Sequence, residues 1–322
     1  MRKAVSLLLI VTIMIGCAGC GTSAKKTVEK PKLTIAYQYS IGYVPVVAMK
    51  EQKLIEKYYD GDIDIEWTML TSGSAINEGI ISGDIDVGFM GVSPFLTGVR
   101  AGIPYKIFSG LSSQPYDLMT NQEDIVSLSD ITNQDKIAVV SLGSAPHIML
   151  AMASKEGLGD AHALDENIVS MSNADGMTAL MSGAVNAQIC IAPYNYMEMN
   201  QNGIHAVNIP DGAWPVGDTV LIGVASETLY NENSEIYKAL CNAMDEAINF
   251  VNNNPKDAAD YLKDEYDEES SVIMKWITDE RSIFSSETQG VMRTQRFMRD
   301  EGFLDGDELS FGEIAFNNVQ GD

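Results

Sequence analysis

The sequence predicts an α/β protein of two similar lobes, each a mostly parallel sheet flanked by helices, hinged by two crossovers of the chain. The first observation behind this prediction is a repeat. The stretch INEGIISGDIDVGFMGVSPF at 76–95 is echoed by GMTALMSGAVNAQICIAPY at 176–194. Each copy contains a Ser-Gly pair that ends a helix, then a short strand, then a proline that opens the next segment. Internal repeats indicate duplicated structural units.

The second observation is that this repeat stays in register beyond the two stretches. Four matched positions lie 102, 101, 100 and 99 residues apart, so single-residue slips are enough to align the copies. The matched positions are Ile35 with Ile137, Pro45 with Pro146, Ser82-Gly83 with Ser182-Gly183, and Pro94 with Pro193.

The third observation is the order of elements within each copy. The first copy predicts strands at 33–37, 63–67 and 85–89, a helix from Pro45 to about Tyr58, and a helix that is capped by 71–74 and ends at 82–83. The second copy predicts strands at 137–140, 169–171 and 185–191, with helices at 147–155 and 173–182. Strands that alternate with helices favour parallel sheets with helical crossovers.

Two strand-like segments are expected to cross between the lobes, the first at 118–121 and the second leading into a strand at 219–225. Lobe 1 is therefore predicted to comprise residues 33–118 and 219–322, and lobe 2 residues 119–218. The last third of the chain is expected to be helical. One apolar face spans 236–250, Pro255 opens a further helix, and residues 287–300 form the last long one.

Length and charge limit the classes of function. The 322 residues exceed one typical core and suit two domains. Acidic residues outnumber basic ones by 45 to 21, which gives a net charge of -24. Nucleic-acid binders carry a basic footprint, so we expect no nucleic-acid partner.

The N-terminus predicts export and anchoring. A basic Arg2-Lys3 pair precedes an apolar run at 4–15 that is too short for an ordinary membrane span, which is typical of a signal peptide (1–16). The following Gly-Cys pairs resemble a bacterial lipobox and predict lipidation of Cys17, with Cys20 as the alternative. Ordinary cleavage and secretion is the other interpretation. Residues 17–32 would then form a lipidated N-terminus and flexible tether, and the mature charge would be -26.

Few signs of catalysis are present. The three histidines lie far apart and lack metal-ligand spacing, and no Walker A, dinucleotide or nucleophile-elbow motif occurs. We therefore expect no metal, no cofactor and no enzymatic activity. Cys190 lies in an apolar strand and is predicted to be a buried small hydrophobe, although a bridge to Cys241 stays open.

The binding chemistry is expected in loops that follow the parallel strands, because ligands of open α/β sheets bind beyond the carboxyl ends of the strands. Free N–H groups at helix starts there favour anionic or polar groups. None of these loops contains Arg or Lys, and each serine could instead only cap its own helix. The loops are 38–43, 71–74, 90–94, 142–147 and 192–195.

Aromatic residues gather on the same loops. Tyr39, Tyr43, Tyr194 and Trp214 offer flat apolar faces with one polar atom each, which suits a small ring or alkyl chain. Phe95 and Tyr196 are interpreted as core residues. His147, at a helix start, is either a neighbour of the cap or a ligand-binding group.

Several motifs together resemble the nitrate/sulfonate/taurine and thiamine-pyrimidine-precursor binding family of ABC-importer lipoproteins. The similarity spans about residues 33–304. The motifs that carry it are IGYVP at 41–45, SGDIDVG at 82–88, AGIP at 101–104, LSD at 128–130 before the strand at 136–140, and MRDEGFL at 298–304.

This resemblance implies a type II periplasmic-binding fold that captures a small polar, anionic or aromatic solute between its lobes. It implies delivery to an ABC permease and ATPase by a monomer anchored outside the cytoplasm of a bacterial cell. The family's ligand contacts map to Tyr39, Ser40, Tyr43, Ser74, Gly91, Ser93, Ser144, Ala145, His147, Tyr194 and Asn195. The aromatic pattern adds Trp214.

Other functions remain open at this level. A pyrimidine, thiamine precursor or other heteroaromatic solute could replace the sulfonate, taurine or nitrate. The fold could also serve a surface sensor without transport. A pyrimidine-synthase-like enzyme of the same superfamily would carry a cysteine-rich motif, and no cysteine cluster follows Cys20.

Overall fold

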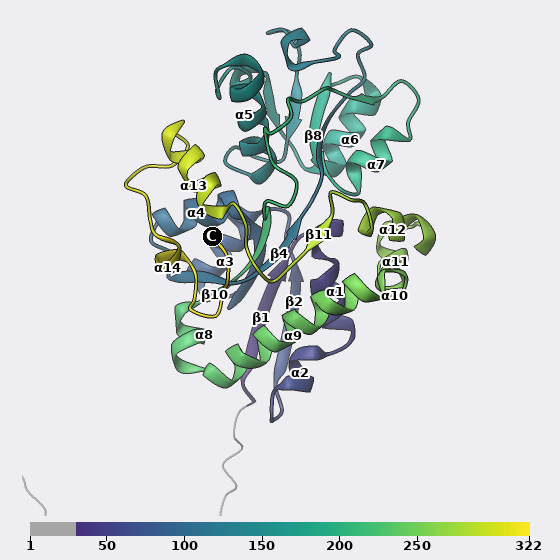
Figure 1. Cartoon of the computed structure of the whole chain (residues 1–322). Coiled ribbons are helices and arrows are strands. Elements are labelled where there is room, and N and C mark those ends of the chain that lie inside the picture. Colours follow the sequence, from purple (N-terminus) through teal and green to yellow (C-terminus); the bar gives the residue numbers. More distant parts are fainter. Residues whose placement is uncertain (1–29) are drawn as a thin grey trace, which may run out of the picture. The chain divides into compact units, whose positions relative to one another are not determined.

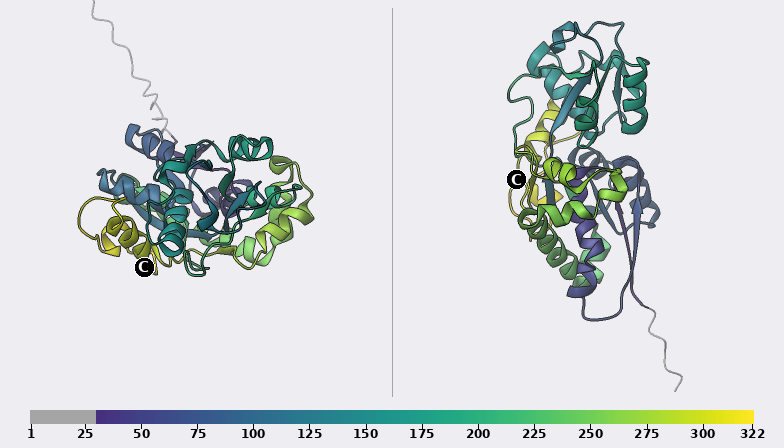
Figure 2. Two further views of the ribbon diagram at one scale, coloured as in Figure 1. Left: turned by 90° about the horizontal axis from the view of Figure 1, so that it is seen from above. Right: turned by 90° about the vertical axis from the view of Figure 1, so that its right-hand side faces the viewer.

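Two mixed β-sheets organise the part of the chain that the computed structural model describes, residues 30–322. The predicted signal peptide, Cys17, Cys20 and most of the predicted tether lie outside these described residues. Residues 31–322 form one compact unit. Figure 1 shows the two sheets in separate lobes, and Figure 2 shows the same separation from two other directions.

Lobe 1 contains a six-stranded sheet in the order β11-β4-β10-β3-β1-β2. Strand β1 lies between β2 and β3 and is parallel to both, whereas β10 is antiparallel to β3 and β4, and β11 is antiparallel to β4. The strands are β1 (Lys32–Tyr37), β2 (Asp64–Met69), β3 (Val87–Gly91), β4 (Tyr105–Ser113), β10 (Leu221–Ser226) and β11 (Ile283–Phe284).

Lobe 2 repeats this arrangement in a five-stranded sheet with the order β7-β6-β8-β5-β9. Strand β6 is parallel to β7 and β8, and β5 is antiparallel to β8 and β9. The strands are β5 (Tyr116–Thr120), β6 (Ile137–Val139), β7 (Ile168–Ser170), β8 (Ala187–Ile191) and β9 (His205–Ala206).

The duplicated two-lobe architecture is confirmed, and the sheets are mixed rather than mostly parallel. Strands joined by helical crossovers are parallel in both lobes, as the repeat predicts. The antiparallel strands are those next to the crossings, because a strand that returns from the other lobe enters its sheet from the opposite end. Strand β10 takes this place beside β3, and β5 takes it beside β8.

The first crossing lies earlier than the predicted 118–121. Strand β4 ends at Ser113 in lobe 1 and β5 begins at Tyr116 in lobe 2, so only residues 114–115 connect them. The segment 118–121 falls largely inside β5, whose apolar residues pair with β8. The second crossing runs from β9 to β10, and β10 returns to the first sheet as predicted.

The helices of the repeat end as their glycines predict. Gly83 and Gly183 have φ of 79° and 75°, a left-handed conformation that costs glycine little, and both follow a ten-residue helix. The helices of these two units are α1 (Val44–Glu51), α2 (Leu54–Tyr58), α3 (Gly73–Ser82), α4 (Val92–Arg100), α5 (Ala145–Leu158), α6 (Asn173–Ser182) and α7 (Tyr194–Met199). Short 3-10 turns are η1 (Ile41–Tyr43), η2 (Leu128–Asp130) and η3 (Asp165–Asn167).

Two helix predictions need correction. The single helix expected from Pro45 to Tyr58 is broken into α1 and α2, because Lys53 adopts a left-handed φ of 52°. The helix expected from residue 287 begins only at Val291, because Gly290 has a φ of 77° and the preceding residues bond to Thr219, to β4 and to the C-terminal segment.

The C-terminal third is helical as predicted and packs mainly on lobe 1. Four residues of the expected apolar face of α9, at 236, 240, 243 and 247, are buried, and Phe250 is partly buried. The helices are α8 (Glu227–Glu232), α9 (Ser234–Asn253), α10 (Pro255–Asp260), α11 (Lys263–Tyr266), α12 (Ser270–Ile277), α13 (Val291–Asp300) and α14 (Phe311–Ile314). No helix in residues 30–322 is both long and apolar enough to cross a membrane.

This C-terminal region also contacts lobe 2 on two sides. The Trp276 ring of α12 is stacked on Tyr196 of α7, with 6.0 Å between ring centroids. Beyond α13, the Phe303 ring is stacked on His162, with 4.5 Å between centroids. The lobes are therefore held by packed side chains as well as by the two crossings.

Candidate ligand-binding site

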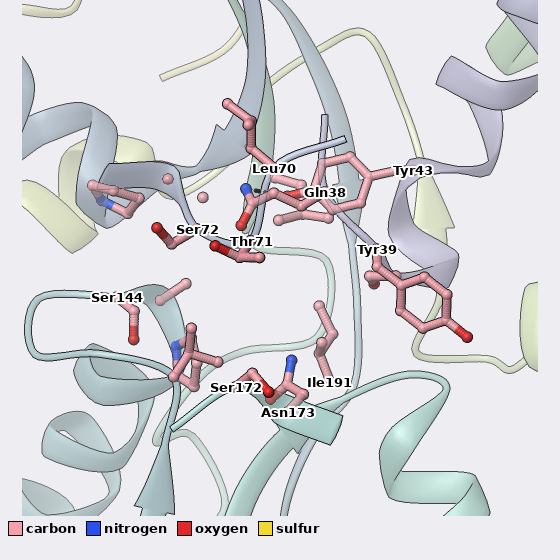
Figure 3. A pocket seen from close by; sticks show the side chains of 18 of the residues that line it. Gln38, Tyr39, Tyr43, Leu70, Thr71, Ser72, Ser144, Ser172, Asn173 and Ile191 are labelled. Carbon is pink, nitrogen blue, oxygen red and sulfur yellow. Dashed lines mark hydrogen bonds between the residues drawn. The ribbon is translucent and has the colours of Figure 1, made fainter. Parts of the chain in front are cut away.

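A cavity of about 330 Å³ lies between the two sheets and is lined from both lobes. All five loops predicted from the sequence contribute to it, because the carboxyl ends of the parallel strands face one another across this space. Figure 3 shows Gln38, Tyr43, Leu70, Thr71 and Ser72 on the lobe 1 side and Ser144, Ser172, Asn173 and Ile191 on the lobe 2 side.

The structure brings seven of the twelve predicted site residues to this cavity. They are Tyr39, Ser40, Tyr43, Gly91, Ser144, Ala145 and Tyr194. They come from both repeat units and from four of the five loops, and residues 71–73 supply the fifth loop.

The other five predicted residues lie elsewhere. Ser74 shares a 2.9 Å hydrogen bond with the Ser72 hydroxyl and lines a smaller neighbouring cavity. Ser93 is 2% exposed within α4. Asn195 is fully buried and donates to Asp117 Oδ2 at 2.7 Å, and Trp214 packs against the main core.

His147 is the fifth of these residues. Its Nδ1 accepts a 2.9 Å hydrogen bond from the Gly143 amide, and its ring meets the edge of Phe303. Burial lowers the pKa of His147, the neighbouring Asp165 only partly opposing this, so the ring is neutral near neutral pH. The histidine therefore fixes the loop before α5 and the contact between lobes.

The sequence analysis missed the turn at the start of α6, residues 172–174, which lines the cavity opposite Thr71 and Ser72. The repeat could have found it, because an offset of about 100 carries 71–74 onto 171–174. Other lining residues that were not singled out include Gln38, which lies in the predicted loop 38–43, and Tyr116 and Leu221. They come from a strand end and from strands at the crossings, where no local motif marks them.

Three helices present unpaired amides to the cavity. The amides of Gly73 in α3, Ala145 in α5, and Asn173 and Ala174 in α6 have no acceptor in residues 30–322, as is normal for the first turn of a helix. The first turns of α3 and α5 contain no acidic residue. These helix ends therefore favour an acceptor or an anion.

The serine hydroxyls are largely used within the protein. Ser72 and Ser172 accept from amides of their own helices, as capping predicts. Ser144 donates to the Ser141 carbonyl at 2.6 Å. The Ser40 hydroxyl donates to the Ala192 carbonyl in lobe 2 at 2.9 Å, so it joins the lobes at the edge of the cavity.

Aromatic rings form one wall. The Tyr39 ring of lobe 1 lies 5.8 Å from the Tyr194 ring of lobe 2 and 4.8 Å from Tyr266 of α11, between centroids. Burial raises the pKa of Tyr39, Tyr43 and Tyr194, so these phenols stay neutral. This wall offers apolar faces and neutral hydroxyl groups.

None of the lining residues, all within the described part, carries a formal charge at neutral pH. Residues 30–322 also contain no group of three or more His, Cys, Asp and Glu side chains that could hold a metal ion. The cavity is therefore an uncharged space with helix N–H donors and tyrosine rings.

Similarity to solved structures defines the fold of this chain. Among solved structures, the alkanesulfonate-binding protein from Xanthomonas axonopodis pv. citri bound to MOPS aligns with a TM-score of 0.73 over 91% of this chain and all of that one, at 17% identity. A Candida albicans protein described as having the generic periplasmic binding protein fold aligns with a TM-score of 0.69 over 86% and 92%, at 15% identity. The chain thus has the two-lobed periplasmic binding protein fold.

The family follows from the sequence. Residues 26–263 match the model of the NMT1-like family, and the chain belongs to that family. A curated protein of Bacillus subtilis (strain 168), named "Putative aliphatic sulfonates-binding protein", is 25% identical over 203 residues. That match covers 61% of this chain and 59% of the relative.

Proposed function

We propose that this protein is the solute-binding component of an ABC-type importer and captures a small organic solute in the cavity between its lobes. One observation carries the proposal: an uncharged cavity is lined from both sheets by unpaired helix amides and by tyrosine rings. The importer role is supported by the family and by the fold. In this proposal the protein binds its solute and does not transform it.

The solute we propose is a monoanion with a short organic part, of the sulfonate type. The amides of Gly73 and Ala145 can stabilise a single negative charge without a basic side chain, since helix ends carry partial positive charge. The rings of Tyr39 and Tyr194 can cover the organic part. Support comes from two relatives whose names describe aliphatic sulfonate and alkanesulfonate binding.

A heteroaromatic solute is the second candidate, and the aromatic wall favours it. Tyr39 and Tyr194 approach each other from different lobes, and a flat ring could pack against either face. Pyrimidines and thiamine precursors are of this kind. The two candidates differ in whether the helix amides or the tyrosines contribute more of the binding free energy.

We further propose that capture closes the lobes about the two crossings, at 114–115 and between β9 and β10. The closed form would be favoured in proportion to its higher affinity for the solute. The lipid anchor at Cys17 or Cys20 would hold the monomer outside the cytoplasm, beside its permease and ATPase. Replacing each cysteine with serine and following incorporation of labelled palmitate would identify the anchor.

The proposal is tested by a thermal-shift screen of the purified protein with sulfonates, nitrate, pyrimidines and flavins. A solute present at 100 times its dissociation constant is expected to stabilise the folded state by about 2.7 kcal/mol. A sulfonate that raises the melting temperature supports the first candidate and a pyrimidine the second. If no small solute shifts the transition, the binding role is contradicted.

A further inference from the structure

The orientation of one side chain in the cavity narrows the chemistry of the solute. We propose that the solute carries an N–H or O–H donor in addition to its acceptor or anionic group, and that Gln38 selects for this donor. This inference rests on the proposed binding function. It distinguishes an amino- or hydroxy-substituted sulfonate from nitrate or a simple alkanesulfonate.

The amide of Gln38 is fixed by two acceptors in lobe 1. Its Nε2 donates to the Tyr43 hydroxyl at 2.9 Å and to the Phe89 carbonyl at 3.4 Å. A carbonyl oxygen can only accept, so a flipped amide would set two oxygens against each other at Phe89. Tyr43 is itself 3% exposed and cannot move away easily. The nitrogen end of Gln38 is therefore held inside the protein.

The oxygen end of Gln38 is consequently turned into the cavity. Figure 3 shows Oε1 pointing into the space between the lobes, near the level of Thr71. This oxygen has no donor in residues 30–322. When a solute displaces water from the cavity, Oε1 must receive a hydrogen bond from that solute or lose the one that it had with water, and a buried acceptor without a partner is costly.

The opposite chemistry lies at the helix starts. The unpaired amides of Gly73 and Ala145 can only donate, whereas Gln38 Oε1 can only accept. A solute that satisfies both needs an acceptor group at one position and a donor at another. The side-chain amide of Asn173 also faces the cavity, has no partner within the described residues and can adapt to either. Among these polar groups, Gln38 Oε1 is the one that is fixed as an acceptor, so it requires a donor on the solute.

The test compares three sulfonates of similar size by calorimetric titration. Taurine and isethionate carry an amino and a hydroxyl group, and 1-propanesulfonate carries a methyl group at the same position. The wild-type protein is expected to bind at least one of the first two about tenfold more tightly than 1-propanesulfonate, the loss expected for an unpaired acceptor. In Gln38→Met, which removes the acceptor and keeps the volume, this ratio should fall to about one.

Two further variants keep the result interpretable. Tyr43→Phe removes one of the two acceptors that orient Gln38, so the ratio should fall although Gln38 is present. Gln134→Met makes the same change at an exposed loop position and should leave the ratio unchanged. Equal binding of all three sulfonates, or a ratio that survives in Gln38→Met, would overturn the role of Gln38 but not the sulfonate site. Failure of all three to bind would overturn the sulfonate class and this inference together.

Discussion

Glu198 shows at the residue scale what the sequence leaves hidden. This α7 carboxyl is fully buried, its Oε2 lies 3.2 Å from the Cys190 thiol, and its Oε1 has no partner in the described part of the chain. Burial raises the pKa of Glu198 to about 7. The sequence predicted a buried Cys190 and left a bridge to Cys241 open, and both Cys190 and Cys241 are free. It could not show that an acid eight residues later packs on the same strand.

A pH-dependent stability follows from Glu198. In the unfolded chain the carboxyl has its ordinary pKa of 4.5. The folded state therefore holds a proton that the unfolded state releases, and stability falls as pH rises from about 4.5 to about 7. Glu198→Gln removes this titration. Relative to the wild type, its free energy of unfolding should gain about 3 kcal/mol between pH 4.5 and pH 8, because folding raises the pKa of Glu198 from 4.5 to about 7.

Urea unfolding at pH 4.5 and pH 8 measures this difference. Glu156→Gln, at an exposed site on α5, provides the matched control and should show no such gain. A stability difference between Glu198→Gln and the wild type that is equal at both pH values would show that Glu198 is ionised in the folded protein.

At the scale of elements, the two repeat units place the large and the small residue of one helix–strand contact on opposite elements. In lobe 1, Ile76 of α3 covers Gly88 of β3, and a side chain at Gly88 would come within 2.5 Å of Ile76 Cγ2. In lobe 2 the sizes are exchanged: Gly176 of α6 leaves room for Gln188 of β8, which donates to the Asn173 carbonyl at 3.0 Å. Gln188 thereby fixes the helix turn that lines the cavity.

This exchange predicts strong coupling between Gly176 and Gln188. A side chain at Gly176 would lie 2.7 Å from the Gln188 amide, so Gly176→Ile should destabilise the protein by about 1–3 kcal/mol. Adding Gln188→Gly, which recreates the pair of lobe 1, should recover at least about 1 kcal/mol in a double-mutant cycle. Thr178→Ala, on the exposed side of α6, should change stability by no more than about 0.5 kcal/mol.

Purely additive effects would rule out this packing account. This pair of residues also shows which features the repeat in the sequence can predict. Positions 76 and 88 of the first unit and the matching positions 176 and 188 of the second are all buried, so the elements could be predicted from the repeat. The exchange of sizes could not, because it depends on contacts between a helix and a strand. The break at Lys53 was missed for a related reason, since nothing local in the sequence marks a left-handed residue there.

At the scale of the whole molecule, the sequence predicted the two lobes and the five loops that meet between them. The individual residues that line the cavity were predicted less completely. His147 and Asn195 lie in the right loops, but their side chains are turned into the protein by Gly143 and Asp117. Which way a loop side chain points depends on its partners in the folded protein, such as Asp117 on the adjacent strand, and sequence alone does not contain that contact.

We propose that one small solute binds between the lobes at the starts of α3, α5 and α6. Calorimetric titration of the most stabilising solute against wild type, Ala145→Leu and Ala184→Leu tests it most directly. Ala145 lines the cavity and is 6% exposed, whereas Ala184 is exposed far from it in the α6–β8 turn. We expect wild type and Ala184→Leu to bind one solute per chain, and Ala145→Leu to bind it at least tenfold more weakly, because leucine occupies the space beside the α5 amides. Equal affinity in all three proteins would contradict it.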